Sequence, residues 1–292
     1  MSDSLGDRMK EYEAASKTRL TRRVPAVLRL DGKAFSSYTS GMLKPYDERF
    51  HRCMWSAAKY LCQNIVGAKL AYVQSDEISI LLVDYDTHET QAYFDNQVQK
   101  IVSVSASMCA VQFYSTYLSE FPESERKNTL PAFDARVFSV PREDVANCLL
   151  WRQQDASRNS LSMLCQSLFS HKQLHGKDRE AQHELLYTKG INWNDCPVPQ
   201  KRGVCLLKET YTVPATSGGH PVLDPTTREF VSSDDVPAIT TRSRWVVDKN
   251  IPIFSTPEGR HYINRFVDPL DDYHGPVYTE SKLEPLQIKG GK

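Results

Sequence analysis

The stretch L-A-Y-V-Q-S-D-E-I-S-I-L-L-V, residues 70–83, decides the fold. Its two apolar runs, 70–73 and 78–83, have the length and composition of buried strands. The segment between them, Q-S-D-E at 74–77, is too short for anything but a hairpin turn. The stretch therefore predicts two strands that are neighbours in the chain and pair antiparallel.

The flanking sequence supplies the rest of a sheet. V-P-A-V-L-R-L at 24–30 predicts a buried strand that ends in the turn dipeptide Asp31-Gly32. Asp47 is a candidate N-cap for a helix with one apolar stripe, which Gly67 stops. The remaining expected elements are a helix over about 91–119 and a strand over 133–140. The order strand, helix, strand, strand, helix, strand is typical of the ferredoxin-like, split β-α-β arrangement, an α+β fold with an antiparallel sheet and helices on one face.

The second half of the chain begins with helical patterning and becomes irregular. Its expected elements are helices over 142–173 and 178–189 and strands over 203–209 and 245–247. The stretch 212–241 is rich in Pro, Gly, Ser, Thr and Asp, which favours a loop, and little periodicity follows Pro276. We therefore expect a first domain over residues 1–140 and a smaller, mostly helical second domain over 141–292.

The composition is that of an ordinary soluble protein. Of 292 residues, 40% are apolar and 25% charged, so a sizeable core is possible. The 36 Lys and Arg balance the 36 Asp and Glu, which disfavours a protein coated in nucleic acid but permits a local basic groove. Residues 17–23 (K-T-R-L-T-R-R) and the pair Lys201-Arg202 are candidate basic patches, with solvated surface charge as the simpler interpretation of each alone.

Cysteine usage and the N-terminus predict a cytoplasmic protein. The seven cysteines are scattered and form no C-x-x-C pair, which predicts free thiols in a reducing compartment rather than disulfides or a zinc cluster. The N-terminus M-S-D-S-L-G-D is polar and acidic, unlike a signal peptide. No apolar run has the length expected of a membrane span, so no membrane partner is expected.

The predicted topology brings two distant carboxylates together. The first and second strands run parallel with the third between them, so Asp31, at the end of strand one, adjoins the hairpin that carries Asp76. Two carboxylates about 4 Å apart repel by on the order of 4 kcal/mol at an effective dielectric near 20. Protonation or a bound cation relieves this repulsion, and Mg²⁺ prefers such oxygen ligands together with substrate phosphates. Two such ions support phosphoryl transfer.

Residues near the two carboxylates have the chemistry of a phosphate site. Gly32 permits a close approach of the backbone to an anion, Lys44 can neutralise phosphate charge, and Ser75 can donate a hydrogen bond. Each feature alone has a simpler interpretation, because Asp-Gly and Ser-Asp-Glu are common turn sequences and a lysine before proline is usually exposed. The combination on one sheet edge carries the catalytic interpretation.

Several longer motifs resemble the tRNA-histidine guanylyltransferase family in consistent order over residues 5–210. They are R-L-D-G-K-A-F (29–35), K-P-Y-D-E-R-F (44–50), Q-S-D-E-I-S-I-L-L (74–82), F-D-A-R-V (133–137), W-R-Q-Q-D-A-S-R-N-S-L (151–161), H-E-L-L (183–186) and K-G-I-N-W-N-D-C-P-V-P-Q-K-R-G-V (189–204). Two of them, D-A-x-R-N and K-G-I-N-x-N-D, are more similar to the bacterial, phage and archaeal "like proteins" than to the eukaryotic enzymes.

The resemblance implies a polymerase-like palm that works in the 3′-to-5′ direction. Such enzymes activate a tRNA 5′-monophosphate with ATP, and the 3′-OH of an incoming GTP or other NTP then expels AMP. The implied partners are tRNA and nucleoside triphosphates, the implied assembly is a homotetramer, and the "like protein" flavour favours templated repair of 5′-truncated tRNA.

The resemblance also assigns roles to residues of this chain. The implied ligands of two Mg²⁺ ions are Asp31, Asp76 and the Gly32 carbonyl, with Glu77 in support. Lys44 and Ser75 would serve activation. The implied nucleotide-binding residues are Gly32, Lys33, Ala34, Phe35, Asp47 and Ser75, and the implied tRNA contacts are Arg158, Asn159, Lys201 and Arg202.

The chain departs from the family at three positions. The family often has a histidine where this chain has Ser36, a histidine at Ser157 and a lysine near Gln182, all of them groups able to contact phosphates. Three alternatives to repair remain open: addition of the extra 5′ guanylate to histidine tRNA, another palm enzyme such as a nucleotide cyclase, and a catalytically idle RNA-binding module.

Overall fold

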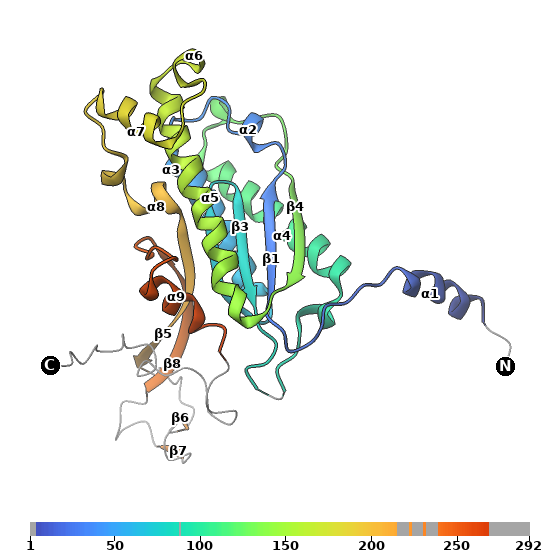
Figure 1. The fold of residues 1–292 in the computed structure, drawn as a ribbon. Coiled ribbons are helices and arrows are strands. Elements are labelled where there is room, and N and C mark those ends of the chain that lie inside the picture. Colours follow the sequence, from blue (N-terminus) through green and yellow to red (C-terminus); the bar gives the residue numbers. More distant parts are fainter. Residues whose placement is uncertain (1–3, 88, 215–221, 224–229, 232–238, 269–292) are drawn as a thin grey trace. The chain divides into compact units, whose positions relative to one another are not determined.

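The computed structural model describes residues 4–87, 89–214, 222–223, 230–231 and 239–268 (Figure 1). The expected alternation of strands and helices is confirmed. Its elements are β1 (Ala26–Gly32), α3 (Glu48–Asn64), β2 (Ala68–Gln74), β3 (Glu77–Leu82), α4 (Val98–Glu120) and β4 (Phe133–Ser139). These strands lie in the order β4-β1-β3-β2, and each neighbouring pair is antiparallel. Strands β1 and β2 are therefore parallel to each other with β3 between them, as the ferredoxin-like topology requires.

Further elements precede, interrupt and extend this unit. They are α1 (Leu5–Ala15), α2 (Phe35–Tyr38), η1 (Tyr93–Asn96), η2 (Glu123–Glu125), α5 (Arg142–Leu168), α6 (His171–Leu174), α7 (Arg179–Tyr187), η3 (Trp193–Asp195), α8 (Val198–Arg202), β5 (Val204–Pro214), β6 (Val222–Leu223), β7 (Phe230–Val231), β8 (Ile239–Asp248) and α9 (Pro257–Asn264). Strands β5 and β8 extend the sheet beyond β2 to six strands, while β6 and β7 pair separately.

Local chemistry explains where the elements begin and end. Asp47 caps α3 as predicted, because its carboxylate accepts the Arg49 N–H at 3.0 Å. The helix expected from about residue 91 begins only at Val98, because Phe94 and Asp95 adopt left-handed backbone conformations (φ 48° and 51°) that a helix cannot contain. Asp31 and Gly32 belong to β1 itself rather than to a following turn, because both pair with strand β4.

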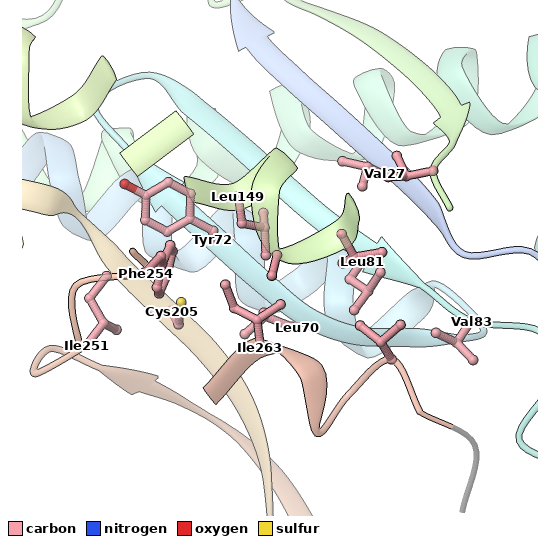
Figure 2. Close-up of a cluster of buried hydrophobic side chains, with 14 of the residues drawn as sticks. Val27, Leu70, Tyr72, Leu81, Val83, Leu149, Cys205, Ile251, Phe254 and Ile263 are labelled. Carbon is pink, nitrogen blue, oxygen red and sulfur yellow. The ribbon is translucent and has the colours of Figure 1, made fainter. Parts of the chain in front are cut away.

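The sheet is covered on both faces. Helices α3 and α4 pack together on the face that carries Leu28, Leu30 and Ile80. On the other face, a cluster of buried side chains joins the sheet to α5 and α9 (Figure 2). Its labelled members are Val27, Leu70, Tyr72, Leu81, Val83, Leu149, Cys205, Ile251, Phe254 and Ile263. Helix α5, from the second half of the sequence, therefore completes the core of the first half.

The compact units of the chain differ in extent from the expected domains. One comprises Met1–Leu207 with Val247–Tyr273, and the other comprises Lys208–Val246 with His274–Lys292. The expected boundary near residue 140 thus falls within the first unit. The stretch 212–241, expected to be a loop, contains the ends of β5 and β8 and the short strands β6 and β7, and the rest of it lies outside the described residues, as does the tail after Pro276.

All seven cysteines lie in the described part of the chain and are free, which confirms the expectation of unpaired thiols. The expectation about membrane spans needs correction in one respect. Helix α4, with 23 residues, is long and apolar enough to cross a membrane by length and composition alone, although core helices of soluble proteins meet the same criterion.

We expect Gly259→Ala to destabilise the fold by about 1–3 kcal/mol, although alanine is the better helix former. A Cβ at this position in α9 would overlap the carbonyl oxygen of Ile253 and lie 2.6 Å from the Cα of Phe254, in the core of Figure 2. Gly6→Ala in α1 is the matched control, since the nearest heavy atom to its Cβ would be Ser4 Oγ at 3.9 Å. Urea denaturation followed by circular dichroism measures both, and equal stability of the two variants would refute this account of α9 packing.

Candidate active site

Three carboxylates lie side by side across one end of the sheet. Asp31 on β1 is the register partner of Glu77 on β3 and of Asp134 on β4. The hairpin residue Asp76 adjoins this row, because the Gly32 N–H donates to the Asp76 carbonyl oxygen at 3.1 Å. The predicted meeting of Asp31 and Asp76 at one sheet edge is therefore present, and two further carboxylates accompany it.

Arginine side chains neutralise the two outer members of the row. Arg152 of α5 donates two hydrogen bonds to the buried Glu77 carboxylate, at 2.7 and 2.6 Å. Arg136, two residues along β4, donates to Asp134 at 2.9 Å. Bidentate guanidinium–carboxylate pairs are among the strongest charged contacts in proteins. Among the ion pairs of the described residues, none involves Asp31 or Asp76.

The pKa values of the two unpaired carboxyls respond to this arrangement. Burial, followed by the negative charges of Asp76, Glu77 and Asp134, raises the pKa of Asp31 from 3.8 to about 6. Burial also raises the pKa of Asp76, while hydrogen bonds from the Ser75 side chain and the backbone oppose that rise. The pair is thus held together against its own repulsion, which is the electrostatic situation that a bound cation relieves.

Strained and close-packed backbone surrounds the pair. Ser75 has a left-handed conformation (φ 48°), which turns the chain sharply between β2 and β3. Gly32 lies against the ring of Phe35 so closely that any Cβ would overlap it. Because the Phe35 ring also stacks on Tyr38 and contacts Phe113 and Phe133, this aromatic cluster fixes the backbone beside Asp31.

Some of the backbone N–H groups expected to bind phosphates already form hydrogen bonds within the protein. The N–H groups of Gly32 and Lys33 already donate to main-chain oxygens of Asp76 and Ala132. Ala34 is left-handed (φ 58°), and the short helix α2 follows it. The backbone donors that remain for an anion are therefore those of Ala34, Phe35 and Ser36, at the start of α2.

A cavity of about 460 Å³ opens beside Asp76. It is lined by Phe35, Ser36, Thr39, Met42, Leu43, Lys44, Pro45, Asp47, Phe50, His51, Ser75, Asp76, Met163 and Gln166. Five of the residues predicted for catalysis or nucleotide binding thus share one cavity, of a size typical for a small-molecule site. Lys44 is exposed at its wall.

Asp47 lines this cavity, but its carboxylate already accepts hydrogen bonds from other groups of the protein. Its carboxylate accepts hydrogen bonds from the Leu43 N–H and from the backbone and guanidinium of Arg49, which lower its pKa. Asp47 therefore shapes the cavity wall and caps α3, and its carboxylate has little remaining capacity for a nucleobase.

The predicted tRNA contacts divide between two places. Asn159, Lys201 and Arg202 line a smaller cavity of about 50 Å³, which shares His51, Ser75 and Met163 with the larger one. Arg158 instead lines a separate cavity of about 360 Å³ and pairs with Asp155 at 2.9 Å. Of the three positions that depart from the family, Ser36 lines the main cavity, Ser157 lines the cavity of Arg158, and Gln182 lines a fourth cavity near His171.

Sequence reasoning missed several residues of this site. His51 is buried between the two connected cavities, stacked on Tyr46 at 3.7 Å, and burial lowers its pKa to about 3, so the imidazole is neutral. The half-exposed Trp151 has the guanidiniums of Arg29 and Arg152 over its ring. Arg29 and Arg136 are cross-strand partners beside the carboxylates. The helical spacing of α5 alone could not show which residue reaches Glu77.

Comparison with known proteins gives one consistent family. Residues 6–141 match the family model "Thg1: tRNAHis guanylyltransferase". The chain is 43% identical to a bacterial tRNA(His) guanylyltransferase (Thg1)-like protein whose structure was solved with ATP, with a TM-score of 0.76 over 91% of this chain and 99% of that one. The corresponding structure with GTP is 40% identical over the same shares of the two chains, with a TM-score of 0.67.

A relative with lower sequence identity belongs to the same family. The tRNA(His) guanylyltransferase of Schizosaccharomyces pombe is 30% identical over 228 residues, which are 72% of this chain and 82% of that protein. The resemblance noted in the motifs is thereby confirmed over most of the chain. This protein belongs to the tRNAHis guanylyltransferase (Thg1) family and is a nucleotidyltransferase.

Proposed function

We propose that this enzyme activates the 5′-monophosphate of a tRNA with ATP and then adds nucleotides to that end, repairing 5′-truncated tRNAs. The observation that carries the proposal is the unpaired Asp31–Asp76 couple beside a cavity lined by Lys44 and Ser75. The similarity to Thg1-like proteins that bind ATP and GTP supports the choice of nucleotides.

The residues present fit a magnesium site of the kind that substrates complete. Asp31 and Asp76 would hold the ions, with the Gly32 carbonyl as a third ligand. Within the described residues, three or more His, Cys, Asp or Glu side chains do not gather into a closed metal cage. This suits Mg²⁺, which is commonly bound by one or two carboxylates together with waters and phosphates. When bound, the ions would offset phosphate charge and increase the reactivity of an attacking oxygen.

The chain's own groups would hold the reactants for two transfers. In the first, an oxygen of the tRNA 5′-phosphate bonds to the α-phosphorus of ATP, and pyrophosphate leaves. In the second, the 3′-OH of the incoming NTP loses its proton and bonds to the 5′-phosphorus of the tRNA, and AMP leaves. Lys44, Ser75 and the N–H groups at the start of α2 would bind the triphosphates, because they line or border the same cavity.

The tRNA would approach along two cationic surfaces. Asn159, Lys201 and Arg202 line the smaller cavity that joins the nucleotide cavity at Ser75. Arg29 and Arg136 border the carboxylates on the sheet, next to the exposed ring of Trp151. Cations that bind phosphates and an aromatic ring on which a base can stack are the usual elements of an RNA-binding surface. This arrangement reconciles a net charge of zero with a polyanionic substrate.

We prefer repair to guanylate addition because the chain is more similar to a Thg1-like protein than to a tRNA(His) guanylyltransferase. The chain is 43% identical to a bacterial Thg1-like protein and about 30% identical to the tRNA(His) guanylyltransferase of S. pombe. Addition of the extra 5′ guanylate to histidine tRNA remains the second candidate, since that is the activity named in the family model. A homotetramer and a cytoplasmic location, which the free thiols suit, complete the proposal.

A single assay separates the two candidates. The protein, Mg²⁺ and ATP are incubated with a labelled 5′-monophosphorylated tRNA that lacks its first nucleotide, or with full-length histidine tRNA. We expect adenylylation of the truncated tRNA, followed by extension only with the NTP complementary to the opposing base. Guanylate addition to full-length histidine tRNA, with no extension of the truncated tRNA, would overturn the repair assignment.

We expect Asp31→Ala and Asp76→Ala each to reduce both activation and nucleotide addition by more than about 100-fold, because each removes a proposed metal ligand. Asp144→Ala is the matched control, since it removes an exposed carboxylate near the start of α5. Circular dichroism verifies that every variant is folded. Substantial turnover by either active-site variant would refute the assignment of the carboxylate pair.

We also expect Asp31→Asn to stabilise the metal-free protein above pH 6. The pKa of Asp31 is about 6 in the folded chain and lower in the unfolded chain. The folded state therefore keeps this proton to a higher pH than the unfolded state does. As a result, the free energy of unfolding falls as pH rises from about 4 through 6. The asparagine variant lacks that part of the fall, so its advantage in Tm over the unmodified protein should grow across this window.

Magnesium should reverse the order of stability of the unmodified protein and Asp31→Asn. Addition of Mg²⁺ at pH 7.5 should raise the Tm of the unmodified protein and have little effect on Asp31→Asn, which lacks a ligand. The control Asp134→Asn removes a carboxylate that Arg136 already holds, so it should keep the Mg²⁺ response. Equal Mg²⁺ responses from the unmodified protein and Asp31→Asn would contradict the metal assignment.

A further inference from the structure

The basic run 17–23 lies at the end of the sheet away from the carboxylates. It leads into β1, whose other end carries Asp31. Figure 1 shows the start of β1 and the end of β4 together at the end of the sheet opposite α2. Ala26 and Asp31 are five residue steps apart, which is about 17 Å along a strand. None of the residues 17–23, all of which the structure describes, lines the nucleotide cavity or the smaller cavity beside it.

The arginines of this run differ in whether a carboxylate neutralises them. Arg19 and Arg22 both pair with Asp95. Among the ion pairs of the described residues, none involves Arg23 or the nearby Arg142, the first residue of α5. Both side chains belong to exposed residues, so two guanidinium charges at this end of the sheet lack a carboxylate partner within the described chain.

These two arginines line one open cavity of about 450 Å³. The other residues of its lining are Val24, Pro25, Ser139 and Pro141. The described residues contribute no carboxylate to the lining, which therefore combines two cations and one hydroxyl with apolar surface. We call this cavity the distal cavity.

Hydrogen bonds fix the backbone on both sides of the distal cavity. Arg23 has a left-handed conformation (φ 60°), and its N–H donates to the buried Asp84 carboxylate at 2.8 Å. On the other side, the Val140 N–H donates to the Pro25 carbonyl oxygen at 2.9 Å, which ties the end of β4 to the start of β1. The cavity is therefore built on the folded sheet, and its two arginines are held near each other before any ligand binds.

The guanidinium of Arg142 rests on a rigid support. Its Cζ lies 4.4 Å from the centroid of the Tyr85 ring. Tyr85 is fully buried, and its hydroxyl donates to the Val267 carbonyl oxygen at 2.7 Å. An arginine that is stacked on a fixed ring loses less conformational freedom when it binds an anion. Arg142 is thus positioned in advance for an anion in the distal cavity.

The chemistry of the lining favours a phosphate that belongs to a polymer. A guanidinium donates two parallel hydrogen bonds to a phosphate, and a hydroxyl such as that of Ser139 adds a third donor. A free small molecule is usually buried over most of its surface, which an open cavity does not achieve. A membrane surface would require exposed Trp, Phe or Leu side chains, and none lines this cavity among the described residues.

We propose that the distal cavity binds a phosphodiester of the tRNA backbone, remote from the 5′ end that reacts at Asp31 and Asp76. This inference rests on the proposed function, which supplies a polyanion long enough to reach both ends of the sheet. A contact about 17 Å from the chemistry stabilises the bound tRNA equally in the ground state and in the transition state. Arg23 and Arg142 therefore increase the affinity for tRNA without changing the rate of the bound complex.

A binding assay without ATP tests this site independently of catalysis. Fluorescence anisotropy of a labelled tRNA gives the Kd at several salt concentrations. The double variant Arg23→Ala/Arg142→Ala should raise the Kd about tenfold, and the slope of log K against log salt should fall by about 1, the loss of one phosphate contact. The variant Arg23→Lys/Arg142→Lys keeps both cations and should keep the slope.

The matched control is Arg8→Ala/Lys10→Ala, which removes the same number of charges from exposed positions of α1. It should leave the Kd and the salt slope nearly unchanged. Circular dichroism verifies that every variant is folded, and Arg142→Glu alone tests the same cavity if the double variant does not fold. An unchanged Kd for the folded Arg23→Ala/Arg142→Ala variant, or an equal change in the α1 control, would overturn the proposal.

Kinetics and a second ligand separate this site from the catalytic one. In the repair assay, the double alanine variant should raise KM for tRNA about tenfold and keep kcat. A 5′-phosphorylated hairpin of about three base pairs, roughly 10 Å long, cannot bridge the two sites and should react equally with both proteins. If the unmodified protein repairs no tRNA, the proposed function fails, while the anisotropy assay still decides the distal cavity. Weaker ATP binding by calorimetry with unchanged tRNA affinity would assign the cavity to a free nucleotide and contradict the proposal.

Discussion

The repulsion between carboxylates at one end of the sheet is the constraint on which the site depends. Backbone pairing places Glu77, Asp31 and Asp134 in adjacent strands at one level, and like charges directly opposite each other destabilise a sheet. The fold removes the repulsion at the two outer positions through Arg152 and Arg136. It leaves the inner charge of Asp31 and the neighbouring Asp76 for another cation. The metal-dependent transfer reaction proposed above would account for this uneven compensation.

Much of the fold could be predicted because its signals are local. The short segment 74–77 between two apolar runs permits only a hairpin, and the order of strands and helices then fixes which strand ends are neighbours. The approach of Asp76 to Asp31 follows from that topology without any knowledge of side chains. Asp47 was identified as a helix cap for a similar reason, since capping depends on the next two or three residues.

The parts that escaped prediction depend on distant contacts. Arg152 reaches Glu77 across 75 residues, and nothing in the spacing of α5 distinguishes it from other arginines on that helix. The left-handed residues Phe94 and Asp95 delay α4, although neither is a typical helix breaker. Asp47 was expected to bind nucleotide, and the hydrogen bonds that its carboxylate accepts from Leu43 and Arg49 became visible only in three dimensions. The residues that share the two cavities likewise come from both halves of the chain.

Helix α5 joins the two proposed functional surfaces in one rigid element. Arg152 touches the carboxylate row, and Asn159, seven residues later, lines the smaller cavity. Seven residues advance a helix by about 10 Å and return it almost to the same side. The number of residues between these two positions therefore determines the relative direction of their side chains around the helix. Over evolutionary time this segment should accept changes of side chain far more readily than changes of length, because one inserted residue would turn everything beyond it by about 100°.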